Sequence, residues 1–142
     1  MFASAYVYVS MFVTAFLAST IVPLGSEPLF IYLAHQGYSL IFLVLIASIG
    51  NFLGSLVNYY IGFLGQKTIL SRYIKIDNRQ FSRSKVLFRK YGNPILFFSW
   101  VPIMGDALTI FAGIVGSDLK KFYIYVFTGK LVRYIILALF FL

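Results

Sequence analysis

The chain has 142 residues, of which 61% are hydrophobic and only 11% are charged, and its formal net charge is +8. Soluble domains carry about 25% charged residues, so this composition excludes an ordinary soluble domain and indicates an integral membrane protein. The absence of cysteine excludes disulfides and cysteine metal sites. We expect one all-α membrane domain over 1–142, with no separate soluble part.

The first half of the chain, 1–66, is almost free of charge. No residue from Met1 to Ser26 is charged, and Pro28 to Gln66 is a second, longer run without a formal charge. Uncharged apolar runs of about 18 residues or more are typical of membrane-spanning helices. We expect an opening helix over 1–20, either spanning or interfacial, and a spanning helix over about 39–65.

Between these two helices the sequence predicts a re-entrant hairpin over 20–37. Pro23, Gly25 and Pro28 interrupt the apolar run there. Proline and glycine break helices, and non-helical backbone at membrane depth is tolerated only where protein or water covers it. We therefore expect these three residues to form the break and to line a cavity.

The middle segment, 67–92, is strongly basic. Eight of the twelve Lys and Arg residues lie between Lys67 and Lys90. Short loops rich in Lys and Arg stay on the cytoplasmic side of a membrane, so we expect the 67–90 loop to be cytoplasmic and no nucleic-acid partner. Residues 77–91 are typical of an interfacial helix with one basic and one apolar side, although a solvated linker fits equally well.

The second half, 93–142, begins with a further broken segment. Only the stretch from Tyr91 to Leu119 separates the basic loop from the basic pair Lys120–Lys121. This stretch is too short for two crossings, which need about 40 residues plus a turn, and one crossing would put the two basic flanks on opposite sides. The sequence therefore predicts a re-entrant hairpin over 93–119, broken at Pro102 and Gly105, and a closing helix over 122–142.

The two halves repeat one another at a constant offset in the numbering (106 − 27 = 102 − 23 = 79). The rarest residues match in register: Pro23 with Pro102, Glu27 with Asp106, Gly37 with Gly116, and Gly50 with Gly129. The first hairpin is expected to enter from outside and the second from the cytoplasm. The predicted architecture is therefore an inverted repeat of re-entrant hairpin plus spanning helix, an arrangement that places binding sites between broken helices.

Four charged residues fall inside the predicted membrane segments: Glu27, Asp106, Lys130 and Arg133. A charge at the bilayer centre costs at least ~2.5–3.5 kcal/mol on insertion scales, so we expect these residues to face inward and pair. Lys130 and Arg133 share one helix face because residues i and i+3 are helical neighbours. We predict a central cluster for substrate binding and proton coupling, with purely structural ion pairs as the alternative.

Other residues carry weaker signals. Asn51 matches Lys130 in the repeat and would line the cavity, and Trp100 either lines it or packs at the interface. A metal site is not expected, because His35 is the only histidine and has no acid beside it. No nucleophile, base and acid form a recognisable set, so we expect no catalytic residues, no cofactor and no enzymatic activity.

Several motifs in order resemble the DedA family, also called the SNARE-associated or VTT-domain family, and its short YqaA-type branch. The motifs are Pro23-Leu-Gly-Ser-Glu27, Gly50-Asn-Phe-Leu-Gly54 followed by Tyr59, Gly62 and Gly65, Ser99-Trp-Val-Pro102-Ile-Met-Gly105-Asp106, Ala112-Gly113 and Gly129-Lys130. The resemblance covers roughly residues 15–135. This chain departs from the longer members of the family at three positions. Longer members often have arginine at the positions of Ser99 and Gly105, and an acidic residue at the position of Ser55.

The resemblance implies two opposed re-entrant hairpins, an inner-membrane location and no enzymatic reaction. It also implies movement of lipids, notably polyprenyl phosphate carriers, with protons coupled through membrane carboxylates such as Glu27. We therefore predict a multi-pass inner-membrane translocator of lipid or polyprenyl phosphate. The alternatives are a proton-coupled transporter of a small soluble ion or solute, and a membrane assembly subunit that transports nothing. The oligomeric state stays open, with a homo-oligomer among the options.

Overall fold

The computed structural model describes residues 2–20, 25–64, 86–101 and 104–140, and every regular element in these ranges is helical. The helices in chain order are α1 (Phe2–Ala18), α2 (Glu27–His35), α3 (Leu40–Leu64), the 3-10 helix η2 (Asn93–Trp100), α6 (Met104–Ile114) and α7 (Leu119–Leu139). Residues 86–91 form one further helical segment. The expected all-α class therefore holds for the described part of the chain.

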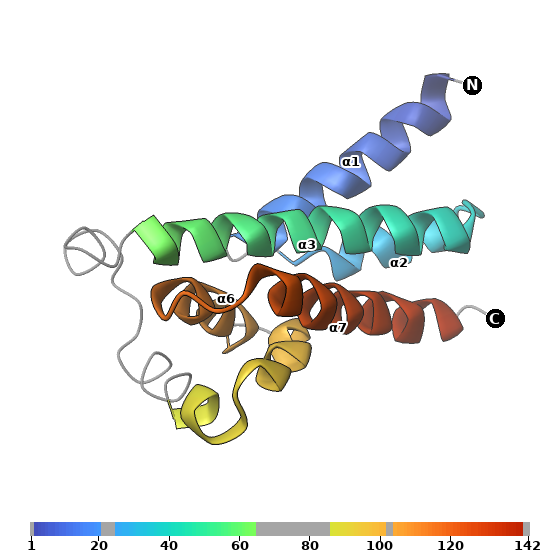
Figure 1. Ribbon diagram of the computed structural model, residues 1–142. Coiled ribbons are helices and arrows are strands. Elements are labelled where there is room, and N and C mark those ends of the chain that lie inside the picture. The colour runs from blue at the N-terminus through green and yellow to red at the C-terminus, as the bar shows by residue number, and fades with distance from the viewer. Residues whose placement is uncertain (1, 21–24, 65–85, 102–103, 141–142) are drawn as a thin grey trace.

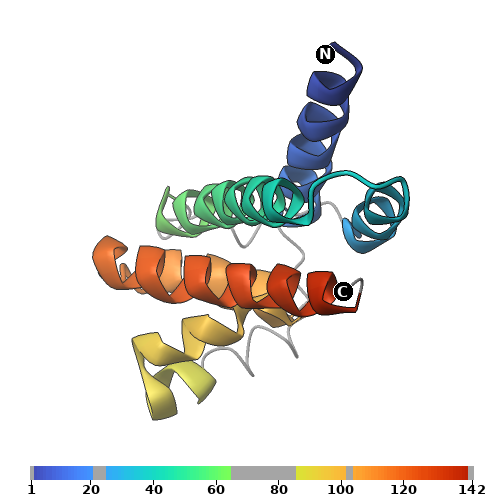
Figure 2. The ribbon, with the colours of Figure 1, turned by 90° about the vertical axis from the view of Figure 1, so that its right-hand side faces the viewer.

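Among the described helices, α3 and α7 are the two that are long and apolar enough to cross a membrane, with 25 and 21 residues. At 1.5 Å per residue, 21 residues extend about 31 Å, which matches a hydrocarbon core of about 30 Å. α3 lies inside the predicted range 39–65, whereas α7 begins at Leu119, three residues before the predicted start. The two helices pack side by side and run antiparallel (Figures 1 and 2).

The remaining helices surround this pair. α1 crosses α3 obliquely and packs on it, while η2 packs on α7 and on α6 (Figures 1 and 2). α6 also packs against α3. Both ends of the drawn chain lie at the end of the molecule where α3 begins and α7 finishes (Figure 1).

The predicted broken segments contain helices with different bounds. The described part of 20–37 holds one helix, α2, and the helix that leads into it is α1, which ends at Ala18. α1 falls within the predicted opening helix 1–20, and the re-entrant hairpin over 20–37 remains a prediction. In 93–119, η2 and α6 flank the break. Pro23 and Pro102 lie outside the described residues.

Most of the basic middle segment also lies outside the described residues. From the predicted interfacial helix over 77–91, only residues from 86 onward are described, and residues 86–91 are helical. The predicted cytoplasmic placement of 67–90 remains a prediction.

Two matching helix ends connect the short helices to the long ones. Gly37 follows α2 with φ 86°, and Gly116 follows α6 with φ 66°; this left-handed region suits glycine, which has no Cβ. At both ends the glycine amide donates to the carbonyl three residues back, at 3.1 Å, and the next amide donates to the carbonyl five residues back. The two caps are separated by the offset of the repeat (116 − 37 = 79), so the α2–α3 and α6–α7 connections are built alike.

Glycines let α1 approach α3 closely. A Cβ atom on Gly50 would lie 2.6 Å from the carbonyl oxygen of Phe12, and one on Gly54 would lie 2.4 Å from that of Phe16. Small residues at such crossings allow helix backbones to touch in membrane proteins. The last turns of α1 therefore lie directly beside the polar side chains of α3.

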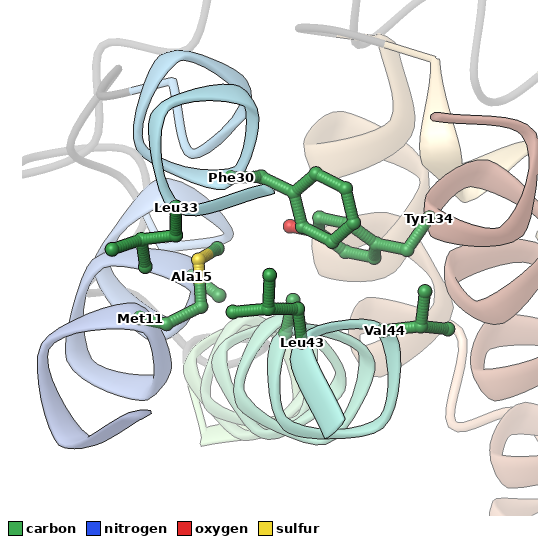
Figure 3. Close-up of a cluster of buried hydrophobic side chains, with 8 residues drawn as sticks. Met11, Ala15, Phe30, Leu33, Leu43, Val44 and Tyr134 are labelled. Carbon is green, nitrogen blue, oxygen red and sulfur yellow. The ribbon is translucent and has the colours of Figure 1, made fainter. Parts of the chain in front are cut away.

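Two clusters of buried apolar side chains form the core. The first draws on α1, α2, α3 and α7 and contains Met11, Ala15, Phe30, Leu33, Leu43, Val44, Ala47 and Tyr134. Figure 3 shows seven of its members labelled, with the rings of Phe30 and Tyr134 stacked obliquely at 5.7 Å between centroids. The second cluster lies between α3, η2, α6 and α7 and contains Tyr59, Ile95, Leu96, Leu108, Ala112, Phe122 and Val126. α3 and α7 contribute side chains to both clusters, so these two helices connect the two parts of the core.

Candidate functional site

An ion pair joins the start of α2 to α7. Glu27 lies in the first turn of α2, followed by Pro28 near the first helical position, where a missing N–H costs nothing and a negative charge is favoured by the helix dipole. Its carboxylate pairs with the guanidinium of Arg133. The Arg133 side chain is 20% exposed and that of Glu27 is 27% exposed, so the pair is partly accessible from outside the protein.

A second contact fixes the same junction. The hydroxyls of Ser26 and Tyr134 form a hydrogen bond of 2.5 Å, and either can be the donor. The guanidinium carbon of Arg133 lies 6.0 Å from the centre of the Tyr134 ring, within range of a cation–π interaction. Tyr134 is fully buried, so two adjacent residues of α7, Arg133 and Tyr134, bind the start of α2.

Lys130 is a fully covered cation on α7, with only 2% of its surface exposed. Its ammonium donates to the backbone carbonyl of Ser99, near the end of η2, at 3.0 Å. η2 approaches α7 closely because the neighbouring residue is Gly129, where a Cβ atom would lie 2.2 Å from the carbonyl of Phe97. The lysine thereby links α7 to the segment that leads into the second break.

Asp106 supplies the negative charge near Lys130. It lies in the first turn of α6, is half-buried, and interacts electrostatically with Lys130. The ion pair between Glu27 and Arg133 is direct, whereas Asp106 and Lys130 interact at longer range. Glu27 therefore has a direct cation partner on α7, whereas no ion pair joins Asp106 to Lys130 among the described residues. The two cations lie about one helical turn apart.

The other predicted site residues have less central places. Asn51 is buried and donates from Nδ2 to the carbonyl of Ala15 at 2.9 Å. Trp100 is half-buried at the end of η2, whereas Gly25 and Pro28 are exposed. Pro23 and Pro102, the predicted centres of the two breaks, lie outside the described residues.

Asn58 was not singled out by the sequence, although it follows Asn51 by two helical turns. Its Nδ2 group donates to the carbonyl of Ser19 at 2.7 Å and to the hydroxyl of Thr109 at 3.2 Å. Thr109 donates in turn to the carbonyl of Asp106 at 2.7 Å. Asn58 thus connects the end of α1, in the first half, to α6, in the second half. The signal that could have identified it is the i, i+7 spacing of two asparagines within an apolar run.

An apolar groove lies between α3 and α7 at the end that holds the described chain ends. It has a volume of about 420 Å³ and is lined by Leu40, Ile41, Val44, Leu45, Leu131, Ile135, Ala138 and Leu139. None of these residues was predicted as a site residue, because an apolar groove residue cannot be told from a lipid-facing one in sequence.

The described residues contain no group of three or more His, Cys, Asp or Glu side chains that could hold a metal ion. His35 lies at the end of α2 and is exposed.

Comparison with known proteins identifies the family. The model of the VTT domain matches residues 1–141. The chain belongs to the VTT-domain family. This VTT-domain protein is 31% identical over 132 residues to the inner membrane protein YqaA of Escherichia coli, which covers 91% of this chain and 87% of that protein. A YqaA protein of Shigella flexneri matches equally well. No solved structure matches the chain.

An uncharacterized protein of Haemophilus influenzae is 34% identical over 138 residues, which covers 89% of this chain and 82% of that protein. These relatives confirm the predicted resemblance to the DedA family and to its YqaA-type branch.

The geometry accounts for one departure of this VTT-domain protein from the longer members. At Gly105 a Cβ atom would lie 1.9 Å from the carbonyl oxygen of Ser99, so no larger side chain, and no arginine, fits in this packing. The same Ser99 carbonyl accepts a hydrogen bond from Lys130. The positive charge next to the segment between η2 and α6 is therefore that of Lys130 on α7.

Proposed function

We propose that this protein is a multi-pass translocator of lipids, of the polyprenyl phosphate class, in the bacterial inner membrane. The observation that carries the proposal is the ion pair between Glu27, at the start of α2, and Arg133 of α7. Asp106 at the start of α6 and the buried Lys130 of α7 are the second acid and base of the proposed site. Intramembrane ionisable residues are expensive and mark substrate or proton pathways. The family membership and the inner-membrane YqaA relatives support the location.

The architecture that supports this activity is an inverted repeat. α1 with α2, and η2 with α6, form the two proposed re-entrant hairpins, and they return to opposite ends of the molecule because α3 and α7 run antiparallel (Figure 1). The matched caps at Gly37 and Gly116 support a common half-unit. In such transporters the site lies at the repeat interface, here at the surface of α7.

The proposed substrate carries a phosphate and long apolar chains. Arg133 has the planar, multiply donating group that suits a phosphate, and its partial exposure gives a head group access. The 420 Å³ groove on α7 and α3 is lined by apolar side chains alone, which suits an acyl or prenyl chain. α7 thus offers both chemistries that a lipid phosphate requires.

Protons couple to the movement through Glu27 and Asp106 in this proposal. A protonated Glu27 no longer neutralises Arg133, so the guanidinium becomes available to the anionic head group. Deprotonation restores the ion pair and displaces the phosphate. The cycle breaks no covalent bond and needs no cofactor, so we propose no enzymatic reaction.

Reconstituted vesicles test this proposal. Protein in vesicles with a fluorescent phosphate lipid in one leaflet should equalise the leaflets faster than protein-free vesicles, and more so across a pH gradient. Glu27→Gln should abolish the excess rate. Asp118→Asn is the matched control, because Asp118 is an exposed carboxylate whose side chain caps the start of α7. Equal rates for the unmodified protein and Glu27→Gln would overturn the proposal.

The same vesicles separate the alternatives left by the sequence. Flux of small anions or cations that depends on Glu27, with no lipid movement, would assign the protein to small-solute transport. Absence of both fluxes in a folded protein would assign it to the class of assembly subunits.

A further inference from the structure

One face of α3 carries a stripe of buried polar side chains. Ser48, Asn51, Ser55 and Asn58 are each at most 1% exposed. They recur at intervals of three or four residues, so they lie on the same side of the helix. From Ser48 to Asn58 the stripe rises about 15 Å, half of a typical hydrocarbon core. No apolar solvent or lipid chain can satisfy such groups, so their hydrogen bonds must be accounted for one by one.

The amide donors of this stripe bind the end of α1 and the residue that follows it, and Asn58 also donates to Thr109 of α6. Asn51 donates from Nδ2 to the carbonyl of Ala15, and Asn58 donates from Nδ2 to the carbonyl of Ser19. Ser55 and Ser19 share a hydrogen bond of 2.8 Å between their hydroxyls. Because both amide nitrogens face carbonyl oxygens, the orientation of each amide is fixed: exchanging its nitrogen and oxygen would set two acceptors against each other.

Three side-chain oxygens of the stripe have no hydrogen-bond partner among the described residues. Among the described residues, no donor reaches Asn51 Oδ1, Asn58 Oδ1 or Ser48 Oγ. The hydroxyl of Ser99 in η2 is also buried without a hydrogen-bond partner among the described residues. A buried polar atom without a partner costs about 1–3 kcal/mol of stability, so three such atoms on one helix face would strongly destabilise the fold.

We propose that a row of bound water molecules occupies this stripe of α3 and supplies the missing donors. Buried waters typically make about three hydrogen bonds to otherwise unsatisfied polar groups. A single metal ion does not fit these atoms, because Asn51 and Asn58 are seven residues, or about 10 Å of helix rise, apart. The lining side chains are also neutral, which suits water.

The water row meets both halves of the protein. At Asn58 it adjoins the end of α1 through Ser19 and α6 through Thr109. Thr109 donates to the backbone of Asp106, the carboxylate residue of the second break. The inference goes beyond the proposed transport function, since hydration of α3 is independent of what the protein carries.

Thiol exchange in heavy water tests the proposal directly. The chain has no cysteine, so a single introduced thiol gives the only S–H stretching band in the infrared spectrum. A thiol exchanges its hydrogen only where water reaches it. Ser48→Cys and Ser55→Cys change one atom of the stripe, and Ser99→Cys probes the orphan hydroxyl of η2.

Ala47→Cys is the matched control. Ala47 is next to Ser48 on the same helix and is equally buried, but it belongs to the apolar core. We expect S–H to become S–D at least about tenfold faster in Ser48→Cys and Ser55→Cys than in Ala47→Cys, where exchange requires local opening. Circular dichroism establishes that each variant is folded before exchange is measured.

Exchange in both serine variants that is as slow as in Ala47→Cys would overturn the water row. If the Ser55→Cys variant does not fold, Ser48→Cys decides alone, because the hydroxyl of Ser48 has no partner among the described residues that the change could break. Neither outcome depends on lipid transport, so failure of the proposed function and failure of this inference are distinguishable.

Discussion

Arg133 and Lys130 show how single charged residues are made tolerable inside an apolar bundle. Arg133 has a direct carboxylate partner and stays partly exposed, whereas Lys130 is covered almost completely and relies on a carbonyl and a more distant carboxylate. Removing one member of a buried pair leaves an uncompensated charge, whereas replacing both members by apolar groups is often neutral. The two cations should therefore respond differently to substitution.

Glu27→Gln should destabilise the protein by about 1–3 kcal/mol, because the guanidinium of Arg133 loses its counter-charge. The double variant Glu27→Gln with Arg133→Met should recover part of that loss, with a coupling energy of about 0.5–3 kcal/mol. The measurement is the free energy of unfolding in mixed micelles, followed by circular dichroism. Strictly additive effects of the two changes would contradict the ion pair.

Gly54→Ala should destabilise the protein by about 1–3 kcal/mol, the usual cost of overpacking. The added Cβ would lie 2.4 Å from the carbonyl oxygen of Phe16 and 2.7 Å from Cβ of Ser19, and a helix backbone cannot yield locally. Val57→Ala, at a side chain that is 37% exposed, is the control and should change stability by less than about 0.5 kcal/mol. Equal melting temperatures for Gly54→Ala and the unmodified protein would refute the close α1–α3 contact.

The helices differ in how well the sequence predicts them. α3 was predicted within one residue at each end, since charge, length and a flanking glycine all mark its limits. α1 and α2 lie within the predicted ranges 1–20 and 20–37, because the proline and glycine residues of the second range mark where the first helix has to stop. The re-entrant hairpin over 20–37 remains a prediction. The polar contacts of Asn58 could not be predicted at all, as they depend on which helix crosses α3 at that turn.

The helix caps at Gly37 and Gly116 provide a test of the repeat at the level of elements. Gly37 has φ 86° and no atom within 4 Å of an added Cβ, so Gly37→Ala should cost about 1–2 kcal/mol from backbone conformation alone. Gly37→Asn should cost less, since asparagine tolerates the left-handed region. Unfolding in detergent measures both, and a cost for asparagine as large as that for alanine would argue against a purely conformational effect.

At the scale of the whole molecule, charge placement in the sequence predicted the two long helices α3 and α7. Of the predicted pairs of acids and bases, the structure shows the one between Glu27 and Arg133. Four charges in apolar segments restrict the possible arrangements severely, because each must find a partner. The apolar groove between α3 and α7 carries no such constraint, so only the structure reveals it. The orientation of the molecule in the membrane is predicted from the basic segment and can be measured.

Gln36 and Val115 are equivalent positions of the two halves (115 − 36 = 79), and both are exposed. Gln36 lies between α2 and the start of α3, and Val115 lies between α6 and the start of α7. Because α3 and α7 are antiparallel and both are long enough to span the membrane, these two positions should lie on opposite faces of it.

In intact cells a membrane-impermeant maleimide should therefore label Gln36→Cys. It should label Val115→Cys only after the inner membrane is permeabilised, and the cysteine-free chain gives no background. Labelling of both variants after solubilisation is the control for reactivity. If both were labelled from the same side in intact cells, the two halves would not be inverted, and the shared surface of α7 could not connect the two faces of the membrane.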